Sequence, residues 1–516
     1  MSVYLFHSSL SLSTAARGIQ YDEALRLRNE GHTIYFLYCN GLMTQCFENI
    51  VGNEALCYMC KSNFRKESKR FEDKINFVPL SDLIDNNFVS HIYEQKFNYQ
   101  SVEDIKKLEY KNINIGLGAL SGYITKSRNL NPLIDDNFRI FFDQNLYNSI
   151  ITTESVFNAI EKYKPDHIVL YNGRFSDSKP IWQIAEKLNI PYTTLEAVYG
   201  VNKNYKAKYE NSTAHSIDNN TKLINYFWDN SDLSFDAKYK IGSLFFERRK
   251  NAIYAGDKIY TKNQTYNLLP DNWDNTKKNI VIFNSSEDEF AAIGGEYEKY
   301  QLFNSQLEGI QFIKNTLKDN SELNITLRIH PNLSEVQYSY ATDLLKLSSD
   351  NFNVINGNSK VSSYALLDNA DIIIVFGSTI GIEAVYWNKP TILLNGAMYY
   401  KLDCCYIPAS TDELISLIKS ELKPKNNIQA IKFGYYFVNE EREGHSVHDY
   451  SWSNKEVRLL NMKKNIQIHN TKKMLGSKRL YSIYNIAKFK FINKFYSIKN
   501  KSGTRFILPI KEDISN

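Results

Sequence analysis

The chain has 516 residues, of which 43% are hydrophobic and 23% charged. That is enough apolar material for two compact domains and too much chain for one ordinary core. With 11 Pro, 22 Gly and 14% aromatic residues, the composition excludes collagen-like, low-complexity and disordered proteins. The net charge of +5 is uneven, because residues 453–516 carry 15 Lys+Arg against 3 Asp+Glu and the first 452 residues carry 47 against 54. A basic surface is therefore predicted in the C-terminal tail.

The sequence pattern predicts a cytoplasmic protein without a signal peptide. No stretch reaches the roughly 18 uninterrupted apolar residues that a bilayer span needs. The first residues also lack a basic segment ahead of an apolar run. In a reducing compartment, grouped cysteines favour metal or redox chemistry over disulfides.

Strand and helix patterns alternate in the first half of the chain. Residues 3–7 predict a buried strand, 19–29 a helix and 33–39 a second strand. After a stretch without clear boundaries, 164–174 predict a strand with a polar loop, 181–188 a helix, and a further strand ends at 195–197. This alternation is typical of a parallel sheet with crossover helices, which binds ligands at the carboxyl ends of its strands.

A second alternating series follows. Strands are predicted at 278–284, 324–330, 371–376 and 391–394, with helices near 300–317, 335–347 and 380–387. The predicted fold is therefore α/β, with two doubly wound Rossmann-type lobes facing a cleft, which resembles the GT-B architecture of nucleotide-sugar glycosyltransferases. The predicted domains are an N-terminal lobe with a Cys-rich insertion (1–200), a helical connection (201–275), a C-terminal nucleotide-sugar lobe (276–425) and a basic helical tail (426–516).

Residues 371–394 carry the sharpest chemical pattern. Gly377 allows a tight turn after a buried strand, and Ser378 and Thr379 stand where a helix begins, so their N–H groups favour a phosphate. Thr379 and Glu383 are four residues apart and share one helix face. The hydroxyls would hold phosphate while the carboxylate accepts from ribose hydroxyls. The alternative is an ordinary helix cap with a solvated glutamate.

A His-Pro pair ends a strand of the same lobe. Because proline stops the ladder, His330 should emerge at the carboxyl edge, beside the Ser-Thr turn. There the imidazole would donate to a phosphate oxygen, with Arg328 as a second cation. A histidine at a strand end is usually structural, but its pairing with the downstream segment favours a binding role.

Together, ArgIleHisPro (328–331), GlySerThrIleGlyIleGluAla (377–384), LysPro (389–390) and AsnGlyAlaMetTyrTyr (395–400) resemble the capsule polysaccharide biosynthesis family. That family includes Kdo transferases, and its His-Pro and Ser-Ser/Thr motifs are similar to those of bacterial sialyltransferases. The resemblance covers residues 280–400 and the general layout of the first lobe. It implies that His330, Ser378 and Thr379 bind the donor phosphate and that Glu383 binds the nucleoside.

An acidic loop follows the first strand of the second lobe. Ser285 and Ser286 are candidate donor ligands, and Glu287 and Asp288 are candidate catalytic carboxylates that orient or deprotonate an acceptor hydroxyl. The loop lacks the Gly that follows the acidic pair in sialyltransferases, so a solvated helix-cap cluster is the alternative.

In the first lobe, polar residues stand at the predicted ligand edge. The candidate acceptor-binding residues are Ser8, Arg17, Asn172 and Arg174. The guanidinium of Arg174 suits an anionic acceptor or a donor carboxylate. Glu196 is a candidate general base.

Four cysteines follow the second strand with the spacing C-x6-C-x10-C-x2-C. Cys39, Cys46, Cys57 and Cys60 predict a structural zinc site, with an iron–sulfur cluster as the less favoured alternative. Four separate buried thiols are the competing interpretation. The adjacent Cys404 and Cys405 are predicted to be packing residues.

The tail contains a basic amphipathic pattern at 479–496, in which Leu480, Tyr484, Ala487, Phe491 and Phe495 alternate with lysines. This pattern suits an anionic membrane surface. Packing on the protein body is the alternative, and no nucleic-acid-binding motif is present.

The sequence therefore predicts a metal-independent glycosyltransferase, cytoplasmic and peripheral at the inner membrane face. It would move a sugar from a CMP- or UDP-activated donor to a growing surface polysaccharide of capsule or O-antigen type, or to a lipid-linked glycan. No cofactor is expected for catalysis, because no Asp-x-Asp motif stands where a diphosphate-bound cation would need it. The alternatives are a sugar-nucleotide epimerase of the same architecture and a non-catalytic polysaccharide- or membrane-binding assembly factor.

Overall fold

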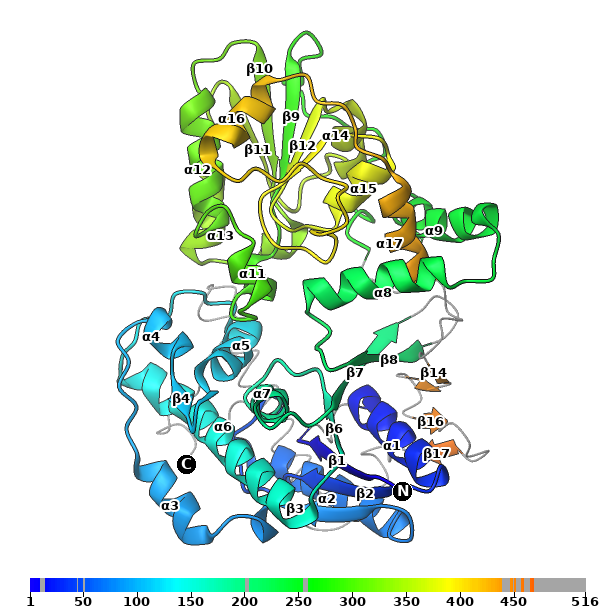
Figure 1. Ribbon diagram of the computed structural model, residues 1–516. Coiled ribbons are helices and arrows are strands. Elements are labelled where there is room, and N and C mark those ends of the chain that lie inside the picture. Colours follow the sequence, from blue (N-terminus) through cyan, green and yellow to red (C-terminus); the bar gives the residue numbers. More distant parts are fainter. Residues whose placement is uncertain are drawn as a thin grey trace. The chain divides into compact units, whose positions relative to one another are not determined.

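The computed structural model describes residues 1–9, 14–43, 45–49, 52–199, 204–253 and 259–438, together with four short strands between 446 and 467. These residues form two compact units. Unit 1 contains residues 1–214 and 291–293 and the strands after 444, and unit 2 contains residues 215–290 and 294–443. Each unit is built of α-helices and a mainly or wholly parallel sheet (Figure 1), so the predicted α/β class is confirmed.

Unit 1 has a seven-stranded sheet in the order β14-β8-β7-β6-β1-β2-β3. The strands are β1 (Val3–Ser8), β2 (Thr33–Tyr38), β3 (Asn76–Pro79), β6 (His167–Tyr171), β7 (Tyr192–Tyr199), β8 (Asn204–Glu210) and β14 (Ser446–His448). The five strands from β3 to β7 pair in parallel, whereas β8 and β14 are antiparallel. Strand order reverses between β1 and β6, so unit 1 is doubly wound.

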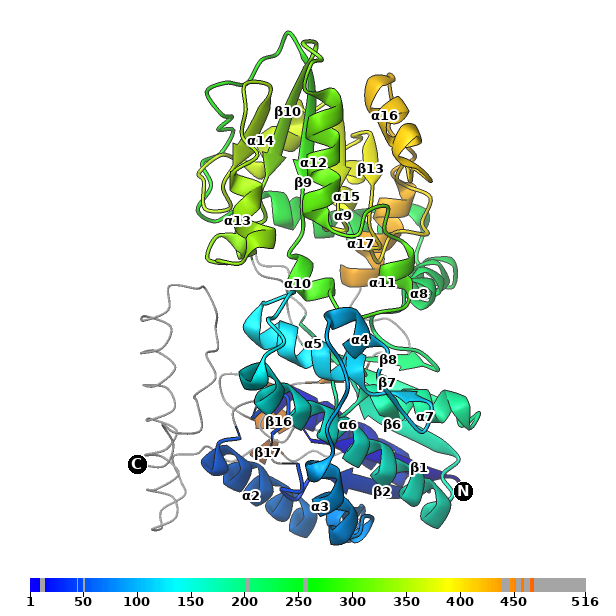
Figure 2. The ribbon, with the colours of Figure 1, turned by 90° about the vertical axis from the view of Figure 1, so that its left-hand side faces the viewer.

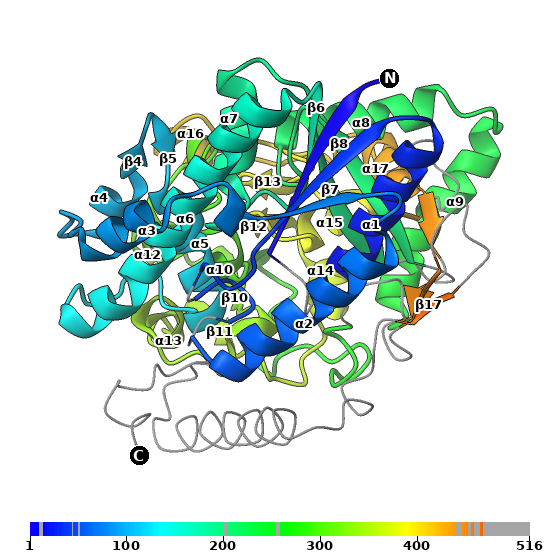
Figure 3. The same ribbon diagram turned by 90° about the horizontal axis from the view of Figure 1, so that it is seen from below.

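Helices cover both faces of this sheet, as Figure 3 shows. One core lies between the sheet and α1 and α2, around Phe6, Ile19 and Phe64. The other lies toward α6 and α7, around Leu5, Ile151 and Ile184. The helices are α1 (Thr14–Asn29), α2 (Glu54–Arg70), α3 (Asn86–Glu94), α4 (Val102–Lys106), α5 (Gly116–Ser127), α6 (Asp136–Tyr163) and α7 (Lys179–Lys187), with a small hairpin of β4 (Glu109–Tyr110) and β5 (Ile113–Asn114).

Unit 2 has a fully parallel five-stranded sheet in the order β11-β10-β9-β12-β13. The strands are β9 (Lys278–Phe283), β10 (Leu323–Arg328), β11 (Phe352–Ile355), β12 (Ile372–Val375) and β13 (Thr391–Leu393). The inner strand β12, between β9 and β13, is buried along its whole length. That burial accounts for the continuous apolar run in its sequence, because parallel strands are covered on both faces.

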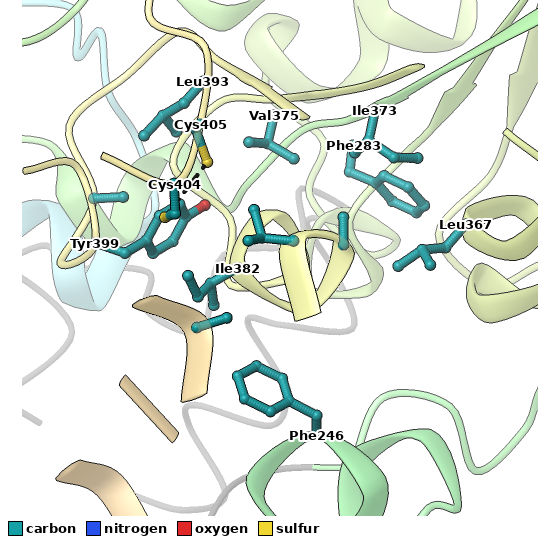
Figure 4. Packing of buried hydrophobic residues seen from close by; sticks show 14 of the residues in the cluster. Phe246, Phe283, Leu367, Ile373, Val375, Ile382, Leu393, Tyr399, Cys404 and Cys405 are labelled. Atoms are coloured by element: carbon teal, nitrogen blue, oxygen red, sulfur yellow. Dashed lines mark hydrogen bonds between the residues drawn. The ribbon is translucent and has the colours of Figure 1, made fainter. Parts of the chain in front are cut away.

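The helices of unit 2 divide between the two faces of its sheet. Figure 2 shows α12 across the strands, and its buried side is formed by Ile310, Ile313 and Leu317. On the other face, the sheet packs against α15 and α17 (Figure 4). Cys404 and Cys405 belong to this core and are 2% and 3% exposed, which confirms them as packing residues. The helices are α8 (Ile217–Asp229), α9 (Phe235–Lys250), α10 (Glu287–Phe290), α11 (Glu296–Lys299), α12 (Gln306–Leu317), α13 (Ser339–Leu345), α14 (Ser363–Asn369), α15 (Ile380–Tyr386), α16 (Thr411–Lys419) and α17 (Ile428–Val438).

The predicted helical connection, 201–275, is divided between the two units. Its first part is β8, which extends the sheet of unit 1, and the buried Nζ of Lys206 pairs there with Asp22 Oδ2 at 2.8 Å. Its helices α8 and α9 belong to unit 2. The backbones of α9 and α17 touch where they cross, since a Cβ on Gly242 would lie 2.4 Å from the carbonyl oxygen of Ile431. A local helical pattern does not reveal this pairing, because the partner α17 is almost 200 residues away.

Most of the predicted tail falls outside the described residues. Only β14 and the three-stranded sheet of β15 (Tyr450–Ser451), β16 (Glu456–Arg458) and β17 (Asn465–Gln467) are described after residue 438. The amphipathic helix at 479–496 lies outside them, so its membrane contact stays a prediction. In the part of the chain that is described, no helix is both long and apolar enough to cross a bilayer.

Candidate functional site

The candidate site lies at the carboxyl edge of the unit 2 sheet. Strand order reverses between β9 and β12, and open α/β sheets bind ligands at such a point. A cavity of about 360 Å³ opens there, which is within the size range of ligand pockets. The segments that follow β9, β10 and β12 all line it, and the charged or polar side chains on its wall belong to Arg249, Tyr260, Thr261, Asn284, Ser285, Ser286, Glu289, Arg328, His330, Ser363, Tyr364, Ser378, Thr379 and Glu383.

The imidazole of His330 is oriented by its neighbours. Its backbone N–H donates to Asn284 Oδ1 at 2.8 Å, and its Nδ1 accepts from the backbone N–H of Asn332 at 3.2 Å. The neutral ring therefore carries its proton on Nε2. The ring of Tyr260 packs edge-on against it, with the centroids 5.0 Å apart. This arrangement provides a preset hydrogen-bond donor on the cavity wall.

Arg328 is a buried cation for which the described residues provide no counter-ion. Its side chain is 2% exposed, and in the described residues no carboxylate lies within ion-pair distance of it. Its guanidinium donates to the carbonyl oxygens of Asn356 and Ser359 and to Ser363 Oγ, the last at 3.5 Å. Burial lowers the pKa of Arg328 to about 10. A buried positive charge that only neutral groups solvate favours an anion in the adjoining cavity.

Two hydroxyls face the same cavity from the turn after β12. Neither the hydroxyls nor the backbone N–H groups of Ser378 and Thr379 have a partner within the described residues. Gly377 forms the turn with φ +82°, and a Cβ there would lie 2.8 Å from the carbonyl oxygen of Gly396. Gly377 therefore shapes the turn without lining the cavity.

Gly377→Ala should destabilise the protein by about 1–3 kcal/mol, because it combines a left-handed backbone with a clash against a carbonyl oxygen. Gly122→Ala is the matched control, since a Cβ at Gly122 in α5 meets nothing within 4 Å. The control should be neutral or slightly stabilising. Urea unfolding of both variants measures this difference, and equal stabilities would contradict it.

Glu383 lines the cavity but is already engaged. Its Oε1 accepts from Arg249 Nε at 3.2 Å, and its Oε2 accepts from the hydroxyl of Tyr364. Burial and the nearby carboxylate raise the pKa of Tyr364 above its ordinary value. A ribose hydroxyl would therefore meet a carboxylate held in place by two donors.

Some residues of the acidic loop line the cavity and others do not. Ser285 and Ser286 line the cavity, but Ser285 Oγ donates to the carbonyl oxygen of Phe376 at 2.9 Å and ties the ends of β9 and β12 together. Glu287 and Asp288 lie in α10 and do not line the cavity. Burial raises the pKa of Glu287 to about 7. The structure therefore places the two predicted carboxylates beside the cavity.

Sequence reasoning missed several residues on the cavity wall. Arg249 lies in the last turn of α9 in the predicted connection, and Tyr364 lies in the first turn of α14, a helix that was not predicted. Tyr260 contacts His330 from a segment without regular structure. The basic run at 248–250 was the only sequence signal, and it is typical of any helix C-terminus.

The first-lobe candidates lie in unit 1. Glu196 is held by the hydroxyl of Tyr171 and the amide of Asn172, both at 2.8 Å, and burial raises its pKa. Asn172 adopts φ +63° and accepts from the backbone N–H of Arg174 at 3.2 Å. Arg174 itself bonds Ser121 Oγ and the carbonyl oxygen of Ala291. Glu196 in β7 and Asn172 and Arg174 after β6 therefore form one connected polar cluster.

Asp177 was not predicted, yet it lies at the point where strand order reverses in unit 1. Its carboxyl is 3% exposed and accepts from Ser9 Oγ, so it joins the loops after β1 and β6. Burial raises the pKa of Asp177 to about 6. An Asp in a loop carries no sequence signal for burial, which is why it was missed.

Asp177→Asn should remove a pH-dependent loss of stability. The folded protein holds the Asp177 proton to higher pH than the unfolded chain does, so this stabilisation is complete below about pH 4 and is lost as pH rises through 6. Two pKa units correspond to about 3 kcal/mol. The variant should therefore match wild type near pH 4 and exceed its unfolding free energy at pH 7. Chemical unfolding at several pH values tests this, and a constant difference would contradict it.

The four clustered cysteines line one cavity of about 20 Å³ in unit 1. Cys57 and Cys60 lie one turn apart on α2, and Asn49 Nδ2 donates to Cys57 Sγ at 3.0 Å. Burial raises the pKa of the Cys39 and Cys46 thiols. Among the described residues, however, no three His, Cys, Asp or Glu side chains are arranged to hold a metal ion. The zinc site stays a prediction, which the zinc and iron content of the purified protein tests.

No protein-family model matches the chain, and no curated protein matches its sequence. Two solved structures from Thermosulfurimonas dismutans are similar in fold. The match to KpsC as a beta Kdo 2,4 transferase covers 52% of this chain and 78% of that chain, with 12% sequence identity and a TM-score of 0.34. The match to KpsC as a beta Kdo 2,7 transferase covers 65% of this chain and 89% of that chain, with 13% sequence identity and a TM-score of 0.31. The match to UDP-GlcNAc 2-epimerase from Neisseria meningitidis covers 85% of this chain and 98% of that chain, with 13% sequence identity and a TM-score of 0.28. At these values the similarities do not identify an activity.

Proposed function

We propose that the protein is a glycosyltransferase that uses a nucleotide-activated sugar, and that the cavity of unit 2 binds the nucleotide. The observation that carries this proposal is the buried guanidinium of Arg328, which has no counter-ion in the described residues and lines one cavity with His330 and the Ser378–Thr379 turn. The ends of β10 and β12 thus converge on a site for an anion that also bears hydroxyl groups.

The proposed chemistry is stabilisation of the departing nucleotide phosphate. Breaking the bond between the sugar and the phosphate builds negative charge on the phosphate oxygen. Hydrogen bonds to that oxygen would come from His330 Nε2–H and from the N–H and hydroxyl groups of Ser378 and Thr379. The positive charge of Arg328 would stabilise it further. Donors that are fixed before reaction favour the charged transition state.

In its finer form, the proposal specifies a CMP- or UDP-sugar as donor and a growing surface polysaccharide or lipid-linked glycan as acceptor. The motifs at 328–331 and 377–384 support that form through their resemblance to the capsule polysaccharide family. We further propose that transfer needs no divalent cation, and that unit 1 supplies the acceptor residues.

The test is to incubate the protein with CMP-, UDP- and GDP-sugars, with and without acceptor glycan and with and without EDTA. Nucleotide release that depends on acceptor and survives EDTA supports the proposal. Isomerisation of the donor without release of nucleotide would instead identify an epimerase. Donors that all stay intact, with no nucleotide binding by calorimetry, would reject both activities.

A further inference from the structure

Two carboxylates among the described residues line the cavity of unit 2, and they differ in accessibility. Glu383 is 4% exposed, and its two oxygens accept hydrogen bonds from Arg249 and Tyr364. Glu289 lies in α10 and is exposed. A glycan acceptor has to approach the cavity from solvent. Glu289 is therefore the better placed of the two carboxylates to meet an acceptor hydroxyl.

The two acidic neighbours of Glu289 in α10 are placed differently. Asp288 is 4% exposed, and its Oδ1 accepts from Ser286 Oγ at 2.8 Å. Neither Asp288 nor Glu287 lines the cavity. Three consecutive acidic residues look alike in the sequence, but only the third lies on the cavity wall.

Asn332 connects Glu289 to the histidine of the site. Its side-chain Nδ2 donates to Glu289 Oε1 at 2.7 Å, and its backbone N–H donates to His330 Nδ1 at 3.2 Å. The same Nδ2 donates to the hydroxyl of Tyr260 at 3.0 Å, and the ring of Tyr260 packs edge-on against His330. One residue therefore positions both a carboxylate and an imidazole on the wall of one cavity.

Sugar transfer needs a group that takes a proton as well as groups that stabilise the leaving phosphate. The acceptor hydroxyl becomes a stronger nucleophile when its proton passes to a base in the transition state. His330 is unsuited to this task, because its Nδ1 accepts from Asn332 and its Nε2 carries the proton of the neutral ring. A carboxylate has about four lone-pair sites, so one that Asn332 orients can also accept from a hydroxyl.

We propose that Glu289 is the general base of the transfer reaction. As the acceptor oxygen forms its bond to the anomeric carbon of the sugar, its proton passes to a carboxylate oxygen of Glu289. The bond between that carbon and the phosphate oxygen breaks, and its electron pair goes to the phosphate, which His330 and the Ser378–Thr379 turn stabilise. This inference rests on the proposed function and adds to it the group that activates the acceptor.

The first test compares kcat for acceptor-dependent release of nucleotide from CMP- and UDP-sugars by the full chain. Glu289→Gln should lower kcat at least about 100-fold, the range found for a positioned base. Glutamine keeps an oxygen that accepts from Asn332, so the variant loses the base without losing this contact. Glu335→Gln is the matched control, because Glu335 is exposed three residues after Asn332 and does not line the cavity. A wild-type kcat in Glu289→Gln would overturn the proposal.

The second test uses Glu289→Ala and sodium formate to separate a base from a structural residue. Alanine leaves space for a small carboxylate, so formate should raise the transfer rate of this variant at least about tenfold. Formate should not raise the rate of Glu289→Gln, whose side chain fills the space, or of wild type. A rate of Glu289→Ala that stays low with formate would assign Glu289 a structural role and contradict the proposal.

Nucleotide binding separates this proposal from the proposed function. Glu289→Gln removes a negative charge beside the phosphate site, so it should bind CMP or UDP at least as tightly as wild type in calorimetry. Acceptor-dependent transfer by wild type that Glu289→Gln retains would reject the base alone. A wild type that binds neither nucleotide, and releases none from its sugar donors, would reject the proposed function and the base with it.

Discussion

His330→Ala should lower kcat for sugar transfer by at least about 100-fold, the range found when one preset donor to a developing negative charge is removed. The backbone N–H of Asn332 occupies Nδ1 at 3.2 Å, so the proton of the neutral ring is on Nε2. The hydrogen bond from His330 Nε2 to the leaving phosphate becomes stronger as negative charge builds on the phosphate oxygen. Because the gain arises in the transition state, the donor KM should change much less than kcat.

Steady-state kinetics with a saturating acceptor measures this effect. His91→Ala is the control, since His91 is an exposed residue of α3 in unit 1 and should leave the rate unchanged. His330→Gln keeps a donor of similar reach and should recover part of the rate. A wild-type kcat in His330→Ala would remove the imidazole from the mechanism.

Arg328→Met should weaken nucleotide binding by about 10- to 100-fold, since interactions with a charged group are worth about 1.5–3 kcal/mol. Arg328 faces the cavity from the end of β10, and its charge is not neutralised by any carboxylate in the described part of the chain. The charge attracts phosphate both before and during reaction. The donor KM should therefore rise more than kcat falls, the reverse of the His330 pattern.

Two further variants separate charge from loop support. Arg328 also bonds the carbonyl oxygens of Asn356 and Ser359. Arg328→Lys keeps the positive charge but lacks the forked donors of the guanidinium. It should restore much of the nucleotide affinity if the charge, rather than the hydrogen bonds to the loop carbonyls, attracts the phosphate. Arg139→Met in unit 1 is the control, because Arg139 also donates to two backbone carbonyls. An unchanged nucleotide Kd in Arg328→Met, measured by calorimetry, would contradict the role in anion binding.

Much of the fold was predictable because its strands are buried on both faces. The apolar runs of β9, β10 and β12 stand out from local composition alone. Helices and strands whose partners lie far along the chain were harder to predict. The strand β8 and the helices α8 and α9 were assigned to one connection, although the first belongs to unit 1 and the other two to unit 2.

The candidate site was predictable to the extent that its residues follow strands. His330, Ser378 and Thr379 stand directly after β10 and β12, and the carboxyl ends of parallel strands meet at one edge. Side chains that reach the cavity from elsewhere were not predictable. Arg249 and Tyr364 hold Glu383 from two helices, and neither is adjacent in sequence to a predicted motif.

The amino-acid sequence by itself determined the alternation of buried strands and helices, and with it the edge where polar residues gather, because burial periodicity and turn chemistry are local properties. Only the tertiary structure decided which charges have partners. Arg328 looks no different in sequence from Arg26, yet Arg328 is buried with no carboxylate within ion-pair distance among the described residues, whereas Arg26 is paired with Glu23. Pairing depends on side chains from distant segments, and it is the absence of a partner that turns a buried arginine into a candidate ligand site.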